Sequence, residues 1–405
     1  MRIENIEAIK INPELREHTK GHEVRFAGID TQTIFRVTCN NGIVGYGDSR
    51  GHTDLTDADT GKIIGRSPFD FIGADLNMGL MGSLYDAMGK HLEQPAYKLI
   101  GQKLRDRIPV AAWTRPASPQ DFATEIQRAT NDGYRIFKMH TCPHHCVIEQ
   151  TRAAEEVAPD GFKIHYDFNH NRSEADTLRI IDQIELSSIV GYLEDPLRSQ
   201  NIEGWRLLRQ RTSLPLLMHV PQLGGGPEIT HGCADLYMVG EVGFSNSLRR
   251  GFAAASSELS TVIQLTGGTL SKAFAMHIAA VLPAVSHSVN LDDQYAEDVT
   301  SQRLEVDEGS TPIPTDPGLG VDVNESILKK LSERPKSQLP RHVGILELPG
   351  GSIFYTPTIP EVESLTGFSE GNIQGVKSRI WNEDGSDNFE EAYAKVKKEG
   401  PYKTE

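Results

Sequence analysis

Between residues 107 and 291 the chain alternates short strand-like runs with helix-like segments. Strands that are separated by helices pair in parallel, so this alternation predicts an α/β fold with a parallel sheet or a barrel. Eight runs are present, and eight parallel strands close a (β/α) barrel. The predicted strands are residues 107–114, 134–140, 162–168, 189–193, 214–220, 235–241, 261–266 and 285–291.

The segment 173–186 shows how the helices between these strands are encoded. Ser173 is a good N-cap residue, and Asp176 occupies the third helical position, where an acidic side chain is favourable. Ile181 and Ile184 then recur at helical spacing, so one face of the helix is apolar. The alternation therefore rests on helix signals as well as on strand signals.

The first 106 residues follow a different pattern. Residues 33–47 predict a hairpin with its turn at Asn40-Asn41-Gly42, and the initial strand extends this hairpin into a small antiparallel sheet. Residues 82–90 predict a helix, and residues 94–101 predict a Pro-containing turn with a short helix. We therefore expect an α+β domain over residues 1–106 and the barrel over residues 107–312.

Residues 332–405 form a C-terminal extension with Pro-, Gly- and Glu-containing sequence. A helix is predicted from Asn388 to Lys398, followed by a charged tail. We expect this extension to be an appendage on the N-terminal domain or at a subunit contact.

Composition narrows the class of partner. Of the 405 residues 38% are hydrophobic, and the formal net charge is -15. Nucleic-acid binding depends on clustered Lys and Arg, so an acidic chain disfavours it. No apolar run approaches the roughly 18 residues of a membrane-spanning helix, and four cysteines are too few for a disulfide scaffold. We expect a cytoplasmic protein that acts on a small molecule and binds neither nucleic acid nor membranes.

Three of the predicted strands end in ionisable side chains, and the strand ends are where (β/α) barrels carry their active sites. Lys138 and His140 close the second strand, Asp167 the third and Glu194 the fourth. Lys138 supplies a cation or a base, and His140 can move a proton near neutral pH. Asp167 and Glu194 are hard oxygen ligands for a divalent ion. Taken together they suit the abstraction of a proton next to a carboxylate.

The phrases around these residues resemble the enolase superfamily, in its mandelate racemase and muconate lactonizing enzyme-like branch. They are Phe137-Lys138-Met139-His140, Tyr166-Asp167-Phe168-Asn169 and Leu193-Glu194-Asp195-Pro196. Residues 82–101 also resemble the helices of that superfamily's capping domain, and Pro317-Gly318-Leu319-Gly320-Val321-Asp322 resembles its return to this domain.

The resemblance implies a modified (β/α)8 barrel with an α+β capping domain, and a homo-oligomer is expected. It implies that Mg²⁺ is the cofactor and that Asp167 and Glu194 hold it. It also implies a small carboxylate substrate, most simply a sugar acid that is dehydrated or cycloisomerised. Asn169, Arg50 and His52 fall where the superfamily contacts its substrate, although Arg50 and His52 can equally be solvated loop residues.

Two positions depart from the superfamily pattern. The acidic residue that closes strand five corresponds to Val220, which cannot hold a metal ion, and His219 is the nearest candidate ligand. Strand alternation puts these two residues on opposite faces, so we expect His219 to reach the ion only through a bulge or turn. A histidine also favours a softer ion than magnesium.

The second departure concerns the base. Lys138 and His140 share one face of their strand, so His140 can be the base while Lys138 binds the carboxylate. Strand seven ends near Thr266 without an imidazole, and strand six offers only Glu241. We therefore expect chemistry on one face of the substrate, that is elimination or cyclisation rather than racemisation.

Two other readings stay open. A barrel that has lost metal chemistry could serve as a binding or assembly protein. The cluster His140-Thr141-Cys142-Pro143-His144-His145-Cys146 could hold zinc in a hydrolase, or it could be an ordinary loop. His165, Cys39 and Cys233 are expected in the core.

Overall fold

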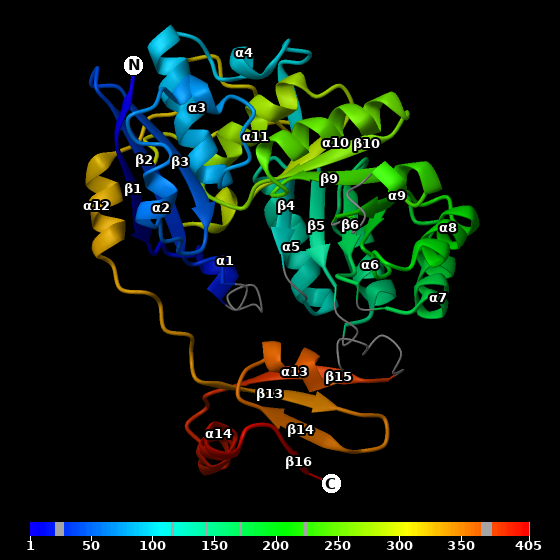
Figure 1. Cartoon of the computed structure of the whole chain (residues 1–405). Helices are drawn as coiled ribbons and strands as arrows, with labels where there is room; N and C mark the ends of the chain where they lie inside the picture. Colours follow the sequence, from blue (N-terminus) through cyan, green and yellow to red (C-terminus); the bar gives the residue numbers. More distant parts are fainter. Residues whose placement is uncertain are drawn as a thin grey trace.

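The computed structural model describes residues 1–20, 28–114, 117–141, 145–170, 172–219, 221, 226–365 and 375–404. Three sheets organise this part of the chain: an N-terminal sheet, a closed barrel and a C-terminal sheet. Figure 1 shows the N-terminal sheet beside the barrel and the C-terminal sheet beneath both.

Eight parallel strands form the barrel, and pairing between the last strand and the first closes it. Each strand overlaps its predicted range, so the predicted fold class is confirmed. The strands are β4 (Arg107–Thr114), β5 (Ile136–His140), β6 (Lys163–Asp167), β7 (Val190–Glu194), β8 (Leu216–Met218), β9 (Leu236–Gly240), β10 (Ser260–Gln264) and β11 (Val285–Val289).

Helices follow the barrel strands and cover the outside of the barrel (Figure 1). In α7 the predicted cap is present, because the Ser173 hydroxyl accepts a hydrogen bond from the Asp176 backbone at 3.1 Å. These helices are α5 (Pro119–Asn131), α6 (Val147–Glu155), α7 (Glu174–Ile184), α8 (Ile202–Arg211), α9 (Gly226–His231), α10 (Phe244–Ser256) and α11 (Thr269–Val281).

The interior of the barrel is filled by alternate residues of the strands, as the two-residue period of a strand requires. One buried cluster includes Trp113, Tyr192, Leu217 and Val262. The residues that alternate with them along each strand, such as Met218 and Ile263, belong to the large cluster under the helices. This alternation decides which side chains at the strand ends point into the mouth of the barrel.

The strand β4 pairs with two different strands along one edge. Its later residues Val110 and Ala111 pair in parallel with β11 and close the barrel. Its first residues pair in antiparallel fashion with β12 (Ser310–Pro312), in register Arg107 to Pro312. The segment between β11 and β12 contains the short helix η3 (Asp292–Gln294).

The capping domain has an antiparallel sheet in the order β1 (Ile3–Ile11), β2 (Gln32–Cys39) and β3 (Val44–Arg50), with the predicted hairpin between β2 and β3. Helix α3 (Met78–Leu92) packs against β3 so closely that a Cβ atom on Gly47 would lie 2.0 Å from the Gly79 carbonyl oxygen. The other helices of this domain are α1 (Glu17–Lys20), α2 (Asp57–Thr60), η2 (Pro68–Phe71) and α4 (Tyr97–Ile100).

After the barrel, the chain contacts the N-terminal part again. The Gly318 backbone N–H donates to the Gln94 carbonyl at 3.0 Å, and Ala96 donates to the Gly318 carbonyl at 2.8 Å. Helix α12 (Glu325–Glu333) then packs on β1.

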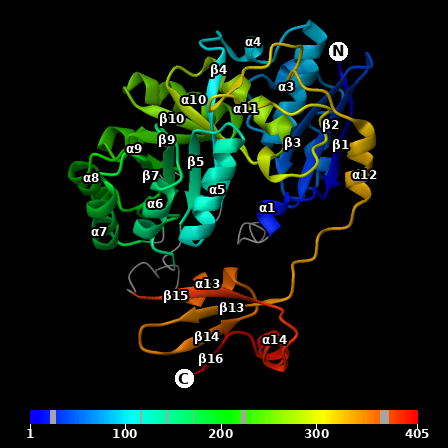
Figure 2. The same ribbon diagram turned by 180° about the vertical axis from the view of Figure 1, so that it is seen from behind.

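The C-terminal extension contains a four-stranded antiparallel sheet in the order β15-β13-β14-β16. One face packs on α14 through Val343, Ile345, Phe389 and Val396, and a second small core includes Leu346 and Val362. Figure 2 shows from behind that an extended segment joins this sheet to α12. The elements are β13 (His342–Glu347), β14 (Ile353–Thr356), α13 (Pro360–Leu365), β15 (Lys377–Asn382), α14 (Asp387–Glu399) and β16 (Tyr402–Thr404).

The predicted helix at Asn388–Lys398 is therefore α14, whereas the sheet was not predicted. The domain boundaries drawn from the sequence stay predictions.

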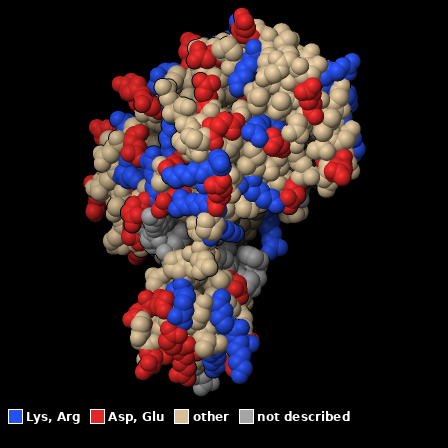
Figure 3. Space-filling view, turned by 90° about the vertical axis from the view of Figure 1, so that its left-hand side faces the viewer, with Lys and Arg blue, Asp and Glu red and all other residues tan. Residues whose placement is uncertain are grey.

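On the face seen in Figure 3, acidic and basic side chains are interspersed. None of the described helices is long and apolar enough to cross a membrane.

Candidate functional site

Charged side chains from three adjacent strands meet inside the mouth of the barrel. The register places His140 opposite Asp167, and Asp167 opposite Glu194. The Lys138 ammonium lies 2.8 Å from Glu194 Oε1 and 3.2 Å from Asp167 Oδ2. All three charged side chains are buried, and that of Lys138 is 0% exposed. Burial makes each charge depend on the others, since an isolated ion is costly away from water.

The pKa shifts follow from this arrangement. Burial opposes the charge of Lys138, but the carboxylates of Glu194 and Asp167 outweigh burial and raise the pKa of the ammonium. Burial also opposes the charge of Asp167, yet Lys138 and His140 lower the pKa of this carboxyl below its usual value. Burial and repulsion from Asp167 raise the pKa of Glu194. Asp167 is therefore the more firmly ionised of the two carboxylates.

His140 lies at the rim of this cluster, and its side chain is 16% exposed. Its Nε2 lies 3.2 Å from Asp167 Oδ2, and its Nδ1 lies 3.1 Å from the Asn169 amide nitrogen. In the neutral imidazole, Nε2 then donates its proton to Asp167 and Nδ1 accepts from Asn169. The ring edge also packs on Trp113, with 5.3 Å between the ring centroids. These contacts fix the orientation of an imidazole that still reaches solvent.

His219 faces the same cluster. Leu217 belongs to the barrel interior, and His219, two residues later, shares its side of the strand. Its Nδ1 lies 3.0 Å from Glu194 Oε1. The expectation that His219 needs a bulge to face inward is wrong, since regular alternation suffices. Val220 lies outside the described residues.

The described part of the chain holds one group of side chains that can share a metal ion: Glu194, Asp195 and His219, whose ligand atoms lie within 4.8 Å of one another. The buried Glu194 Oε2 has no hydrogen-bond partner anywhere in the described part of the chain. Asp195 has a φ of 43°, in the left-handed region, which bends the strand end. An orphaned carboxylate oxygen beside an imidazole and a second carboxylate fits a divalent ion.

This group differs from the predicted one. Asp167 is not part of it, and its carboxylate pairs with Lys138 and His140 instead. Sequence reasoning missed Asp195, although its place directly after Glu194 was visible. Asp195 also lies 3.0 Å from His170 Nε2, and its Oδ1 accepts a hydrogen bond from the His219 backbone at 2.9 Å.

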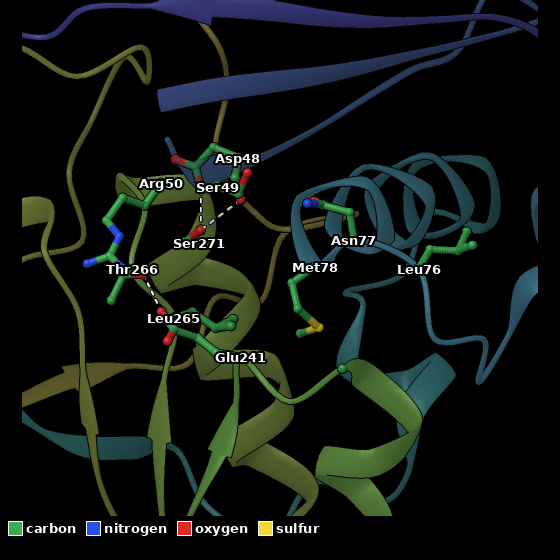
Figure 4. A pocket seen from close by; sticks show the side chains of 11 residues that line it. Asp48, Ser49, Arg50, Leu76, Asn77, Met78, Glu241, Leu265, Thr266 and Ser271 are labelled. Carbon is green, nitrogen blue, oxygen red and sulfur yellow. Dashed lines mark hydrogen bonds between the residues drawn. The ribbon is translucent and has the colours of Figure 1, made fainter. Parts of the chain in front are cut away.

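A cavity of about 310 Å³ opens between the capping domain and the ends of β9 and β10. Figure 4 shows Arg50 reaching toward Thr266 and Glu241, with Asn77 and Met78 on the other side. The cavity is lined by Asp48, Ser49, Arg50, Leu76, Asn77, Met78, Glu241, Gly243, Leu265, Thr266 and Ser271.

Two predicted substrate-binding residues, Arg50 and Glu241, line this cavity, and the Thr266 hydroxyl donates to Glu241. His52 does not line it, and its Nε2 lies 3.2 Å from the Ile11 carbonyl oxygen. Lys138 is absent from the lining as well, but Gln264 connects it to Glu241. The cavity and the charged cluster are therefore neighbours.

The remaining candidates have structural surroundings. His165 packs with Tyr192, at 3.6 Å between ring centroids, and with His287 inside the barrel, as expected for a core histidine. Cys39 and Cys233 are buried. Cys142 and His144 of the predicted zinc cluster lie outside the described residues, and Cys146 is exposed.

Part of the chain is similar in sequence to known proteins. Residues 91–221 match the family model described as enolase C-terminal domain-like. The predicted resemblance to the enolase superfamily is confirmed. The chain is 25% identical to D-gluconate dehydratase of Thermoproteus tenax over 64% of this chain and 56% of that protein. It is 24% identical to D-galactonate dehydratase of Variovorax paradoxus over 67% of this chain and 78% of that protein.

The fold has solved counterparts. The structure of an N-succinyl Arg/Lys racemase from Bacillus cereus superimposes with a TM-score of 0.69 at 20% identity. The match covers 82% of this chain and 99% of the racemase, so the racemase fits almost wholly within the present fold. The unmatched part is about the size of the C-terminal sheet with its helices and linker.

Proposed function

We propose that the chain is an enzyme of the lyase or isomerase kind that removes the proton alpha to a carboxylate. The substrate is a sugar acid, and the reaction is dehydration or cycloisomerisation in carbohydrate metabolism. The observation that carries the proposal is the buried Lys138, Asp167 and Glu194 cluster with His140 at its rim. The dehydratases among the relatives support the substrate class.

His140 is the proposed base. Its Nδ1 exchanges the hydrogen bond from Asn169 for the substrate and accepts the proton from the alpha carbon. The electron pair of the broken C–H bond moves onto the carboxylate oxygens. The Lys138 ammonium stabilises that negative charge. Departure of the beta hydroxyl needs one proton, which protonated His140 returns from the same face, so water leaves and a double bond forms. Asn169 orients His140, while Arg50 and Glu241 contact the substrate hydroxyls.

We further propose a divalent ion, Mg²⁺ in the first instance, as cofactor. Glu194, His219 and Asp195 would hold it, and Asp167, which lies beside Glu194, is the further predicted ligand. When bound, such an ion supplies positive charge to the enediolate oxygens. The histidine makes a softer ion than magnesium a specific alternative.

The test is exchange of the alpha proton in deuterated water, with aldonates such as gluconate and galactonate as substrates. His140→Asn should lower the exchange rate by roughly 10² to 10⁴, the range typical of a positioned base. Near-normal exchange in the folded variant would exclude His140 as the base. Dehydrated or cyclised products support one-face chemistry, whereas inverted starting material with deuterium at the alpha carbon contradicts it.

The alternative is a binding or assembly protein without metal chemistry. It is favoured by the position of Lys138, whose ammonium already lies within 3.2 Å of a carboxylate oxygen on both Asp167 and Glu194. Saturable binding of an aldonate without exchange or turnover, in protein loaded with Mg²⁺ or Mn²⁺, would support this alternative.

A further inference from the structure

Gln264, the last residue of β10, lies between the charged cluster and the cavity. Its Oε1 accepts a hydrogen bond from the Lys138 ammonium at 3.0 Å. Its Nε2 donates to Glu241 Oε2 at 3.4 Å. Gln264 is 8% exposed and its contact with Lys138 is buried, whereas Glu241 is exposed at the cavity.

The chemistry of the partners fixes which way the Gln264 amide points. An ammonium group can only donate hydrogen bonds, and an ionised carboxylate can only accept them. The amide oxygen must therefore face Lys138 and the amide nitrogen must face Glu241. An apolar side chain at this position would lose both contacts.

The backbone also forces Gln264 and Glu241 together. Gln264 pairs with Gly240, which has a φ of 113° in the left-handed region that favours glycine. A Cβ atom on Gly240 would lie 2.2 Å from the Gln264 carbonyl oxygen. The chain turns at this glycine, and Glu241 comes to face both the Gln264 amide and the Thr266 hydroxyl.

We propose that Gln264 is a positioning residue that couples Lys138 to Glu241. It directs the third N–H of the ammonium, since the other two point to Glu194 and Asp167. It also holds the Glu241 carboxylate on the wall of the cavity. The role rests on the proposed function, in which Lys138 stabilises the substrate carboxylate and Glu241 contacts its hydroxyls.

The experiment reverses the direction of the amide. Q264E keeps an acceptor for Lys138 but places a second carboxylate next to that of Glu241. The value of kcat for alpha-proton exchange should therefore fall roughly 10- to 100-fold, as is usual when a partner that orients a reactive group is lost. In the double variant Q264E/E241Q, the amide introduced at position 241 can donate to the carboxylate introduced at position 264. The net charge equals that of the starting protein, and kcat should rise at least about tenfold above that of Q264E.

Q264L and a control complete the series. Q264L should lower kcat and raise KM, because it releases both Lys138 and Glu241. Q150L is the matched control, since Gln150 is also buried but donates to the Ala117 carbonyl at 2.6 Å, away from the charged cluster. Q150L should lower the melting temperature and leave kcat unchanged. Unchanged kcat and KM in Q264L, or a double variant no better than Q264E, would overturn the proposal.

The experiment distinguishes failure of the proposed function from failure of the role proposed for Gln264. If the unmodified protein exchanges no aldonate proton, that function is rejected. The coupling is then read from thermal unfolding of four proteins: the unmodified protein, Q264E, E241Q and Q264E/E241Q. A non-additive effect of the changes at positions 264 and 241 on the melting temperature supports the link. Additive effects overturn it.

Discussion

Asp48 joins the capping domain to the barrel, and its buried carboxyl should make the stability of that junction depend on pH. Its Oδ2 accepts a hydrogen bond from the Gly268 backbone at 2.7 Å, just before α11, and the Ser271 hydroxyl donates to its Oδ1. The side chain is buried, and burial, helped by the negative charge of Asp298, raises the pKa of Asp48 to about 7.

The sign of the effect follows from the protons bound in each state. Between the ordinary pKa of 3.8 and a pKa of about 7, the folded protein keeps the Asp48 proton while the unfolded chain has lost it. The free energy of unfolding therefore falls as the pH rises through this window. At about 1.36 kcal/mol per unit, two pH units from 5 to 7 correspond to a loss of about 3 kcal/mol.

Asp48→Asn removes the titration and keeps the shape. The amide oxygen can accept from Gly268, and the amide nitrogen can donate to the Ser271 oxygen. Urea unfolding followed by circular dichroism at pH 5 and pH 8 gives the difference in stability for each protein. This difference should be smaller in D48N than in the unmodified protein by about 3 kcal/mol.

The control is Asp70→Asn, since the Asp70 side chain is 45% exposed and pairs with Arg66 on the surface of the same domain. D70N should keep the pH dependence of the unmodified protein. If D48N and D70N lose stability equally between pH 5 and pH 8, the carboxyl of Asp48 does not carry a raised pKa and the reasoning fails.

Three further predictions follow. Burial lowers the pKa of His277 to about 4. As the pH falls from 6.5, the unfolded chain therefore binds a proton before the folded protein does, and the free energy of unfolding should drop by about 3 kcal/mol by pH 4. His277→Gln should reduce this drop, as measured by acid unfolding curves. Glu194→Gln should abolish tight uptake of Mg²⁺ or Mn²⁺ in titration calorimetry, whereas the control Glu203→Gln, at a surface site on α8, should not. Deletion of residues 341–405 should leave the melting temperature of the barrel nearly unchanged, because the large core ends at Leu331 and the C-terminal cores begin at Val343. A loss of cooperative unfolding would show that the two parts stabilise each other.

The barrel could be predicted because its signal is repeated. Each strand and helix carries its own periodicity, and cap residues such as Ser173 mark the boundaries. The C-terminal sheet could not be found in this way. Its strand β16 has only three residues, and β15 alternates weakly between intermediate and exposed side chains. Such strands are defined by their neighbours rather than by their own sequence.

The charged cluster could be predicted where a single strand determines the position of each side chain. Lys138, His140, Asp167 and Glu194 lie at the strand ends because each strand has a fixed alternation. His219 was harder, since the exact end of β8 determines whether residue 219 or 220 faces inward. Asp195 and Gln264 were missed for another reason. Their contacts involve partners from other strands, His219 and Lys138, that no local pattern reveals.

The edge of β4 that is shared by β11 and β12 bears on how the chain folds during synthesis. Val110 pairs with Ser288, and 288 − 110 = 178 residues separate them. At about 5 to 20 residues per second, the ribosome needs roughly 10 to 40 s to make the partner after β4 emerges. During that interval the strand has an open edge, to which another chain could add. Arg107 and Pro109 lie on that edge, where a charge and a missing N–H group discourage such addition until the rest of the barrel arrives.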